Sequence, residues 1–387
     1  MFGSDVMRDF KNIKRIVIKV GSSSLVKKDL SINIKVLNSI MLGFSKLKEL
    51  GIDSCLVTSG AIAIGMHELG LTKKPTNMAL KQACAAVGQA KLMESYNSVA
   101  KLYELKLGQI LVNHDDFQIR KRMVLLSDTL DSMFKNNIIP VINENDALAV
   151  DEIKVGDNDT LASLISPMVN ADLLVLFSDI DGLYDKNPKL YKDAKMINNV
   201  SRIDDSILAM ATGSTSSVGT GGMETKIKAA LISNMSGLDM IICNSNKIDE
   251  LVDIVKGKEI GTLFNKYEKC ISSRDDWMIF KTNSCGEIIL DKNFKNDLNK
   301  KKVSILPSGI TEVKGEFLKG SIIDIKNSDG IIIAKGLTNY SSDEINLIKG
   351  HKSSECTEII GHKGKNEVIH ADNLVVIKED LNGFFIK

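Results

Sequence analysis

A glycine-rich segment that leads into a predicted helix carries the strongest chemical signal in the sequence. It runs Gly219-Thr220-Gly221-Gly222-Met223-Glu224-Thr225-Lys226. Unpaired backbone N–H groups at the start of a helix bind anions, and a lysine one turn later adds a positive charge. The segment is neither a Walker A loop nor a Gly-x-Gly-x-x-Gly turn. It predicts a phosphate-binding site, and the alternative is a flexible loop without function.

A second lysine stands at the end of the first predicted strand, beside small residues. The segment is Lys19-Val20-Gly21-Ser22-Ser23-Ser24. Glycine and serine let backbone N–H groups approach a phosphate closely, and Lys19 would place a charge near the transferred group. A plain strand-to-helix turn explains the segment equally well.

Small residues also follow the second predicted strand, in Val57-Thr58-Ser59-Gly60-Ala61-Ile62-Ala63. Open α/β sheets bind ligands at the carboxyl ends of their parallel strands, which is where this segment would lie. Close packing of a helix against a strand would account for the same residues.

The densest polar cluster comprises Asn143-Glu144-Asn145-Asp146 and Lys154-Val155-Gly156-Asp157-Asn158-Asp159. The first run follows an apolar strand, and so many polar groups beside a core strand need hydrogen-bond partners or a ligand. A solvated loop is the alternative. Asp157 or Asp159 could instead cap the helix that is predicted to start near Thr160.

Ser178-Asp179 directly follows another apolar strand. A carboxylate at that position can orient a lysine or face a nucleotide, although aspartate is also common in ordinary turns between a strand and a helix.

Alternating strands and helices would position these segments. The predicted strands are 15–20, 53–58, 108–112, 138–142, 172–177 and 239–243, and the predicted helices are 34–50, 78–105, 122–136, 160–169 and 225–235. Several strands are apolar on both faces, as buried parallel strands are. We therefore predict an α/β domain with a mainly parallel sheet between two layers of helices. Two lysines, two glycine-rich segments and a carboxylate cluster at one edge of this sheet form the inventory of a phosphoryl-transfer site.

The sequence changes character after about residue 276. Short β-like segments, 286–290, 302–305, 321–325 and 330–334, are closely punctuated by glycines and turn residues. We expect a first domain over 13–265 and a small, mostly β domain over 277–370, with the boundary within 266–276. Residues 1–12 are expected to form a loose tail.

Composition excludes several classes of protein. The chain has 387 residues and a net charge of +1, which gives no electrostatic reason to expect bulk binding to nucleic acid or membrane. Its six cysteines are scattered, so a zinc site or a disulfide framework is not expected. The longest apolar strand is too short to span a bilayer. A cytoplasmic protein is the default expectation.

The order of these motifs resembles the amino acid kinase family. The resemblance is carried by Ile18–Ser22, Val57–Ala63, Asn143–Asp146, Ile153–Asp159 and Gly219–Lys226, with further likeness in Ala83–Gln89, Gly182–Tyr184 and Gly261–Phe264. Residues 277–369 resemble a PUA domain, notably in Leu306–Gly315. The fold that the resemblance implies is the amino acid kinase fold followed by a PUA-like domain.

The resemblance also implies residue roles. Lys19, Lys226 and Asp179 would be catalytic, with both lysines on the phosphates of ATP. The ATP site would comprise Lys19, Gly21, Ser178, Asp179, Thr220, Gly221, Gly222, Met223, Glu224, Thr225 and Lys226. Ser59, Asp146 and Asn158 would bind glutamate. Mg²⁺ would bridge the phosphates, held mostly by them and by water, so no protein metal ligand is expected. Ser178 stands where the family pattern has threonine, and Glu224 is a carboxylate within the phosphate segment.

The branch of the family that the chain most resembles uses ATP to phosphorylate the side-chain carboxylate of L-glutamate, the first step of proline biosynthesis. One alternative is a family member acting on another carboxylate or a carbamate. Another is an RNA-binding PUA protein with a relic kinase domain. Residues 277–387 hold 16 lysines, no arginine and 15 carboxylates, so nucleic acid is not expected as a partner. The resemblance further implies a dimer or tetramer, feedback inhibition by proline, and transfer of the product to a glutamyl phosphate reductase.

Overall fold

The computed structural model describes residues 8, 10, 13–113, 115–148, 157–188, 190–212, 222–267, 284–292, 303–362 and 364–377. The chain divides into two compact units, Met1–Ile271 and Ser272–Lys387. The expected boundary within 266–276 lies mostly outside the described residues. Within the described part of the chain, no helix is both long and apolar enough to cross a membrane.

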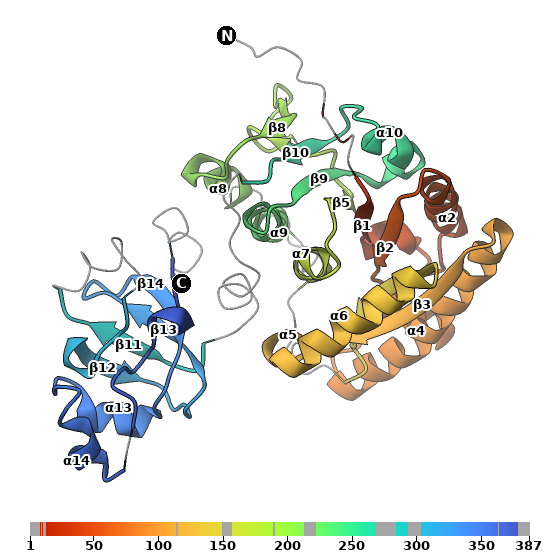
Figure 1. The fold of residues 1–387 in the computed structure, drawn as a ribbon. Coiled ribbons are helices and arrows are strands. Elements are labelled where there is room, and N and C mark those ends of the chain that lie inside the picture. Colours follow the sequence, from red (N-terminus) through yellow and green to blue (C-terminus); the bar gives the residue numbers. More distant parts are fainter. Residues whose placement is uncertain are drawn as a thin grey trace. The chain divides into compact units, whose positions relative to one another are not determined.

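An eight-stranded sheet forms the centre of the first unit (Figure 1). Its strands, in spatial order, are β3 (Lys106–Val112), β4 (Ile138–Glu144), β2 (Asp53–Val57), β1 (Arg15–Val20), β5 (Leu173–Ser178), β9 (Asp239–Asn244), β10 (Thr262–Phe264) and β8 (Asn199–Val200). All neighbouring strands pair in parallel except β9 and β10, which are antiparallel. The mainly parallel sheet expected from the apolar runs is therefore confirmed. A separate two-stranded ribbon joins β6 (Leu183–Tyr184) and β7 (Met196–Ile197).

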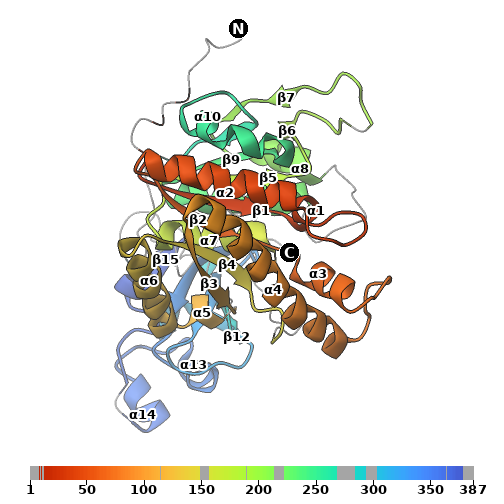
Figure 2. The ribbon, with the colours of Figure 1, turned by 90° about the vertical axis from the view of Figure 1, so that its right-hand side faces the viewer.

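Helices cover both faces of this sheet (Figures 1 and 2). On one face lie α2 (Ile34–Glu49) and α4 (Met78–Ala100), and on the other lie α6 (Arg120–Lys135), α7 (Asn158–Met168) and α9 (Met223–Met235). The shorter helices are α1 (Ser22–Leu25), α3 (Ala61–Glu68), α5 (Asp115–Gln118), α8 (Asp205–Thr212) and α10 (Leu251–Val255). The apolar stripe of α2, which includes Ile40 and Phe44, packs with β1 and β2 in one continuous core.

Helix α3 lies unusually close to α4. A Cβ atom on Gly65 of α3 would meet the Cys84 carbonyl oxygen at 1.8 Å, and a Cβ on Gly88 of α4 would meet the Ala61 carbonyl oxygen at 1.8 Å. Any larger residue at either glycine must push the two backbones apart. The sequence reading assigned no helix to 61–68 and extended the next helix to 105, but α4 ends at Ala100 and a short 3-10 turn follows.

The expectation of a loose N-terminal tail is wrong at Arg8. This side chain is 7% exposed, and its guanidinium donates to the carbonyl oxygens of Ile260 (2.6 Å), Gly261 (2.7 Å) and Asn198 (3.1 Å). These carbonyls lie next to β10 and β8, so the segment around Arg8 satisfies acceptors at that edge of the sheet.

The second unit contains a five-stranded sheet. Its strands, in spatial order, are β12 (Ile310–Lys314), β11 (Glu287–Leu290), β13 (Ile322–Lys326), β14 (Ile332–Leu337) and β15 (Leu374–Val376). Three of the expected strands appear with shifted ends. Of the expected strand 302–305, the described residues 303–305 form only a single bridge, between Ile305 and Ile369. Two helices were not expected, α13 (Ser342–Ile348) and α14 (Cys356–Ile360). The start of α13 is fixed by a capping box formed by Ser341 and Glu344.

Candidate active site

Four neighbouring strands bring the predicted segments to one edge of the sheet. Lys19 is in register with Val57, Val20 with Phe177, and Val57 with Ile142. Because β1, β2, β4 and β5 are parallel, the residues that follow each strand meet at the same edge. The segments around Lys19, Ser59, Asn143 and Ser178 therefore converge, as the sequence predicted.

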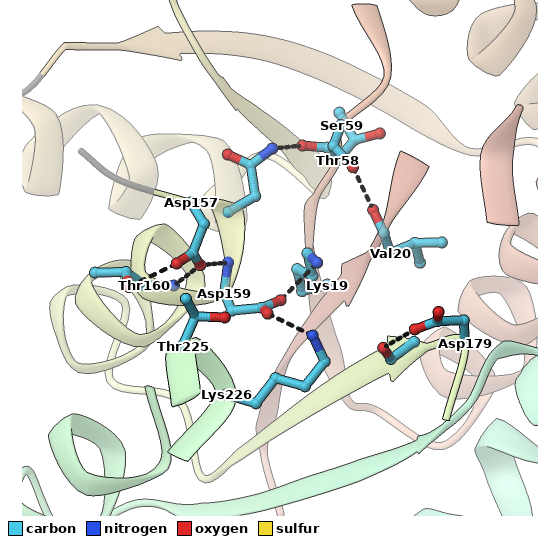
Figure 3. A network of polar contacts seen from close by, with 12 residues as sticks. Lys19, Val20, Thr58, Ser59, Asp157, Asp159, Thr160, Asp179, Thr225 and Lys226 are labelled. Carbon is cyan, nitrogen blue, oxygen red and sulfur yellow. Dashed lines mark hydrogen bonds and ion pairs between the residues drawn. The ribbon is translucent and has the colours of Figure 1, made fainter. Parts of the chain in front are cut away.

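The two predicted lysines share one carboxylate. Lys19 Nζ lies 2.5 Å from Asp159 Oδ1, and Lys226 Nζ lies 2.9 Å from Asp159 Oδ2 (Figure 3). The three side chains come from β1, α9 and α7, and all are buried, with Asp159 only 1% exposed. Asp159 thus fixes both ammonium groups at the end of the sheet.

The two lysines keep the carboxyl group of Asp159 ionised. Burial alone would raise the pKa of Asp159, but the nearby charges of Lys19 and Lys226 outweigh it and hold that pKa below its ordinary value. Asp159 is therefore ionised at neutral pH. The two lysine side chains bring cationic groups to the end of the sheet, where an incoming phosphate could bind them.

Helix α7 begins in a way that directs Asp159 toward the lysines. Asp157 is the N-cap, and its Oδ1 accepts from the backbone N–H groups of Asp159 (2.7 Å) and Thr160 (2.8 Å). Burial and the charge of Asp159 raise the pKa of Asp157. Of the two capping candidates, Asp157 is the cap, and this frees the Asp159 carboxylate for the lysines.

Lys226 lies in the first turn of α9, as the glycine-rich motif predicted. Gly222 is the N-cap of this helix, and Thr225 Oγ1 donates to the Gly222 carbonyl at 2.8 Å. Met223 is half-buried and Glu224 is exposed. Thr220 and Gly221 lie outside the described residues, as do residues 154–156 of the carboxylate cluster.

The other predicted nucleotide residues lie at the ends of β1 and β5. Gly21 is the N-cap of α1, and a Cβ there would lie 3.5 Å from Lys19 Nζ, so glycine keeps the space beside this ammonium open. Ser178 Oγ donates to Asp179 Oδ1 at 3.0 Å (Figure 3). Asp179 is exposed, and the carboxylate that contacts both lysines is Asp159 rather than Asp179.

Two of the residues that were predicted to bind glutamate, Ser59 and Asn158, lie near the start of α3. Ser59 Oγ donates to the Val20 carbonyl at 3.0 Å, and Asn158 Nδ2 donates to the Thr58 carbonyl at 2.6 Å (Figure 3). Gly60 caps α3 with φ of 96°, a left-handed conformation that favours glycine. The first N–H groups of α3 are thereby available to an anion beside Ser59.

Asp146 is the third residue that was predicted to bind glutamate. It borders a cavity of about 350 Å³ between α3, α4 and the ends of β3 and β4. The polar lining residues are Gln89, Gln109, Glu144, Asn145 and Asp146, and alanines form much of the remainder. The volume suits a small ligand, and the two carboxylates favour a cationic group at this end.

Sequence reasoning missed the central role of Asp159. A signal was present, because an acidic residue in the first turn of a helix whose other residues are almost all buried needs a cationic partner. It placed Asn143 in the polar cluster and Gln89 in a segment of family likeness but gave neither a role, and the two side chains are buried and hydrogen-bonded to one another.

A family comparison agrees with this arrangement. Residues 14–244 match the model of the amino acid kinase family, and residues 286–360 match the PUA domain. The chain belongs to the amino acid kinase family. Membership confirms the fold and the kinase class that the motifs predicted.

Several amino acid kinase relatives match nearly the whole chain. Glutamate 5-kinase of Caldanaerobacter subterraneus subsp. tengcongensis is 44% identical over 365 residues, covering 94% of this chain and 98% of the relative. Glutamate 5-kinases of Carboxydothermus hydrogenoformans (42%; 95% and 98% covered) and Pasteurella multocida (38%; 94% and 99% covered) are similar. Among solved structures, UMP kinase from Bacillus anthracis matches at a TM-score of 0.46 and 16% identity, over 65% of this chain and 96% of that one.

Proposed function

We propose that this chain is a glutamate 5-kinase, which transfers the γ-phosphoryl group of ATP to the side-chain carboxylate of L-glutamate. The observation that carries the proposal is the Lys19–Asp159–Lys226 cluster, set at the same sheet edge as the cavity that Asp146 borders. The near full-length similarity to glutamate 5-kinases supports the choice of substrate.

The lysines would act on the phosphates. Lys226 would stabilise the charge that develops on the transferred phosphoryl group, and Lys19 would hold the phosphates in line. Asp159 would keep both ammonium groups in place without the rearrangement that a flexible lysine otherwise needs. Asp179 and Ser178 at the end of β5 would lie against the nucleotide.

The acceptor carboxylate needs no general base, because a glutamate side chain is already ionised at neutral pH. Asp146 would pair with the α-ammonium group of the substrate. Ser59 and the first N–H groups of α3 would hold a carboxylate. Since Ser59 Oγ–H donates to Val20 here, it must rotate before it can donate to the ligand.

Mg²⁺ would enter with ATP. In the described part of the chain no three or more His, Cys, Asp or Glu side chains form a group that could hold a metal ion. Both oxygens of Asp159 are engaged by lysines. This donor set fits an ion that phosphate oxygens and water coordinate, and the ion would supply further charge neutralisation at the phosphates.

The same proposal covers organisation and partners. The kinase domain would be 13–265 and the PUA-like domain 277–370, in a cytoplasmic dimer or tetramer. Proline would inhibit the enzyme, and the acyl phosphate product would pass to a glutamyl phosphate reductase. These features are supported by the family resemblance alone.

A hydroxamate assay for acyl phosphate tests the proposal directly. L-Glutamate, L-aspartate and N-acetylglutamate are compared with saturating MgATP, and Lys226→Ala serves as the inactive control. The proposal requires product with L-glutamate in large excess over the other two. Equal or higher rates with N-acetylglutamate or aspartate would assign the chain to another branch of the family.

A further inference from the structure

Four carboxamide side chains form a hydrogen-bonded chain from the start of α7 to the cavity. Asn158 Nδ2 donates to Asn143 Oδ1 at 3.0 Å, and Asn143 Nδ2 donates to Gln89 Oε1 at 2.9 Å. Gln89 Nε2 then donates to Gln109 Oε1 at 3.3 Å. The two inner side chains are shielded from water, since Asn143 is 1% and Gln89 8% exposed.

Two backbone groups, one beside Asn158 and one beside Asn143, fix which atom of each amide donates and which accepts. The Thr58 carbonyl can only accept, so the Asn158 atom 2.6 Å from it must be the amide nitrogen. The Glu144 backbone N–H can only donate, so the Asn143 atom 2.9 Å from it must be the oxygen. Asn143 therefore presents its NH₂ group to Gln89, which must accept through Oε1.

This direction decides what Asn158 offers to a ligand. Both N–H groups of its amide are engaged, one by Thr58 and one by Asn143. The atom that remains for a ligand is Oδ1, which is an acceptor. An acceptor recognises an ammonium group and repels a carboxylate, so the orientation of this amide discriminates between the two ends of an amino acid.

Gln89 is well placed to enforce the orientation. Its neighbour Gly88 is locked against α3, where a Cβ would meet the Ala61 carbonyl oxygen at 1.8 Å. About two turns further along α4, the buried Tyr96 hydroxyl lies 3.0 Å from Thr58 Oγ1. Helix α4 thus supports both partners of Asn158. Without Gln89, the buried Asn143 NH₂ group would lose this acceptor, and the Asn143 amide would be held from its oxygen side alone.

We propose that Gln89 is a positioning residue for amino acid recognition: through Asn143 it holds the Asn158 amide so that Oδ1 is offered to the substrate ammonium. The inference rests on the proposed function. The hydrogen bonds of Gln89 go to Asn143 and Gln109, whereas Lys19 and Lys226 bind Asp159, so the effect of Gln89 should fall on the amino acid rather than on ATP.

The test is steady-state kinetics of Gln89→Met in the full chain, with Lys91→Met on the same helix as the matched surface control. Methionine has a similar length but offers no comparable acceptor to Asn143. We expect the KM for L-glutamate to rise on the order of tenfold, with kcat and the KM for ATP within about threefold of wild type. Gln89→Glu keeps an oxygen acceptor, so its KM is expected to lie closer to wild type than to Gln89→Met.

A double-mutant cycle separates positioning from general damage to the fold. If Gln89 acts through Asn143, adding Gln89→Met to Asn143→Ala will not raise the glutamate KM by more than about twofold beyond Asn143→Ala alone. The inference would be overturned if the two substitutions multiplied each other's effect on the glutamate KM. It would also be overturned if Gln89→Met left the glutamate KM unchanged or raised the KM for L-glutamate and the KM for ATP equally. The wild-type rate with L-glutamate in the same assay reports on the proposed function separately. If that rate is absent, the proposed function fails and the inference falls with it.

Discussion

Lys226 and Asp159, 67 positions apart in the sequence, form an ion pair in which Nζ lies 2.9 Å from Oδ2. The same carboxylate holds Lys19 through its other oxygen. One aspartate therefore ties together the first strand and the helix that follows the glycine-rich segment.

Replacing Lys226 by alanine should reduce kcat by about 10²-fold or more, by analogy with the loss of one donor to a developing charge. The matched control is Lys228→Ala, which removes an exposed lysine from the same helix. Steady-state kinetics with MgATP and L-glutamate provide the measurement. A near-normal kcat in Lys226→Ala would remove this residue from the transfer step.

Asp159→Asn should destabilise the unliganded protein by about 3–5 kcal/mol, because two buried ammonium groups lose their counter-ion. Asp193→Asn breaks an exposed pair with Lys186 and should cost about 1 kcal/mol or less. Chemical denaturation gives both values. Inorganic phosphate should raise the Tm of Asp159→Asn more than that of wild type, since the anion replaces the missing charge. An equal shift in both proteins would contradict the electrostatic account.

The stabilisation from Asp159 should depend on pH with a definite sign. Its folded pKa lies below the value of about 3.9 expected in an unfolded chain, so its contribution is fully present above that pH and is lost as the pH falls through the folded pKa. The pKa of Asp157 is raised, so its contribution to stability changes with pH in the opposite sense. The comparison is therefore made between Asp157→Asn and Asp157→Asn/Asp159→Asn, since asparagine also caps helices. Their difference in unfolding free energy should be constant at neutral pH and shrink below about pH 4; a constant difference down to pH 2 would refute the assignment.

Gly88→Ala should destabilise the protein by about 1–3 kcal/mol or more, because the new methyl group must push α3 away from α4. Val87→Ala, at an exposed position of the same helix, is the control. Since α3 starts beside Ser59, the glutamate KM should rise as well while the ATP KM changes little. Thermal unfolding and kinetics measure the two effects, and a variant as stable as Val87→Ala would show that the helices have room to separate.

Asp146→Ala should mainly impair the use of glutamate, because it removes a carboxylate from the cavity that would receive the ammonium group. Asp128→Ala makes the same charge change at an exposed site on α6. The measurements are KM for L-glutamate and Kd for ATP. Equal losses of affinity for both ligands would show that the cavity is not the amino acid site.

The sequence predicted the elements whose apolar pattern is strong. Strand β1 was placed exactly at 15–20, and α2 was predicted to within one residue of its end, because burial on both faces of a strand and a 3.6-residue stripe leave clear patterns. Helix α3 was missed because its first six residues are all apolar or glycine and only His67 and Glu68 at its end are polar, so no polar face marks it. The capping box at Ser341 was visible in the sequence and was overlooked.

The site was only partly predictable for a different reason. Lys19 and Lys226 could be found from local chemistry, because each stands beside glycines and a predicted helix start. Asp159 could not be separated from Asp157, since both are aspartates near a helix start and only the tertiary packing shows which one caps it. The amide chain through Gln89 depends on contacts across 54 positions, which no local spacing reveals.

The bonds of Arg8 have a practical consequence for where the polypeptide can be shortened. Residues ahead of a first strand are usually removed freely when a protein is trimmed for expression or crystallisation. Here a start at Ile13 would delete a guanidinium that serves three carbonyl groups far along the chain, two of them in buried hydrogen bonds. Gly257, where a Cβ would meet the Arg8 carbonyl oxygen at 2.3 Å, belongs to the same docking site. The shortest stable form of the kinase unit should thus begin before Arg8, several residues ahead of the first recognisable strand.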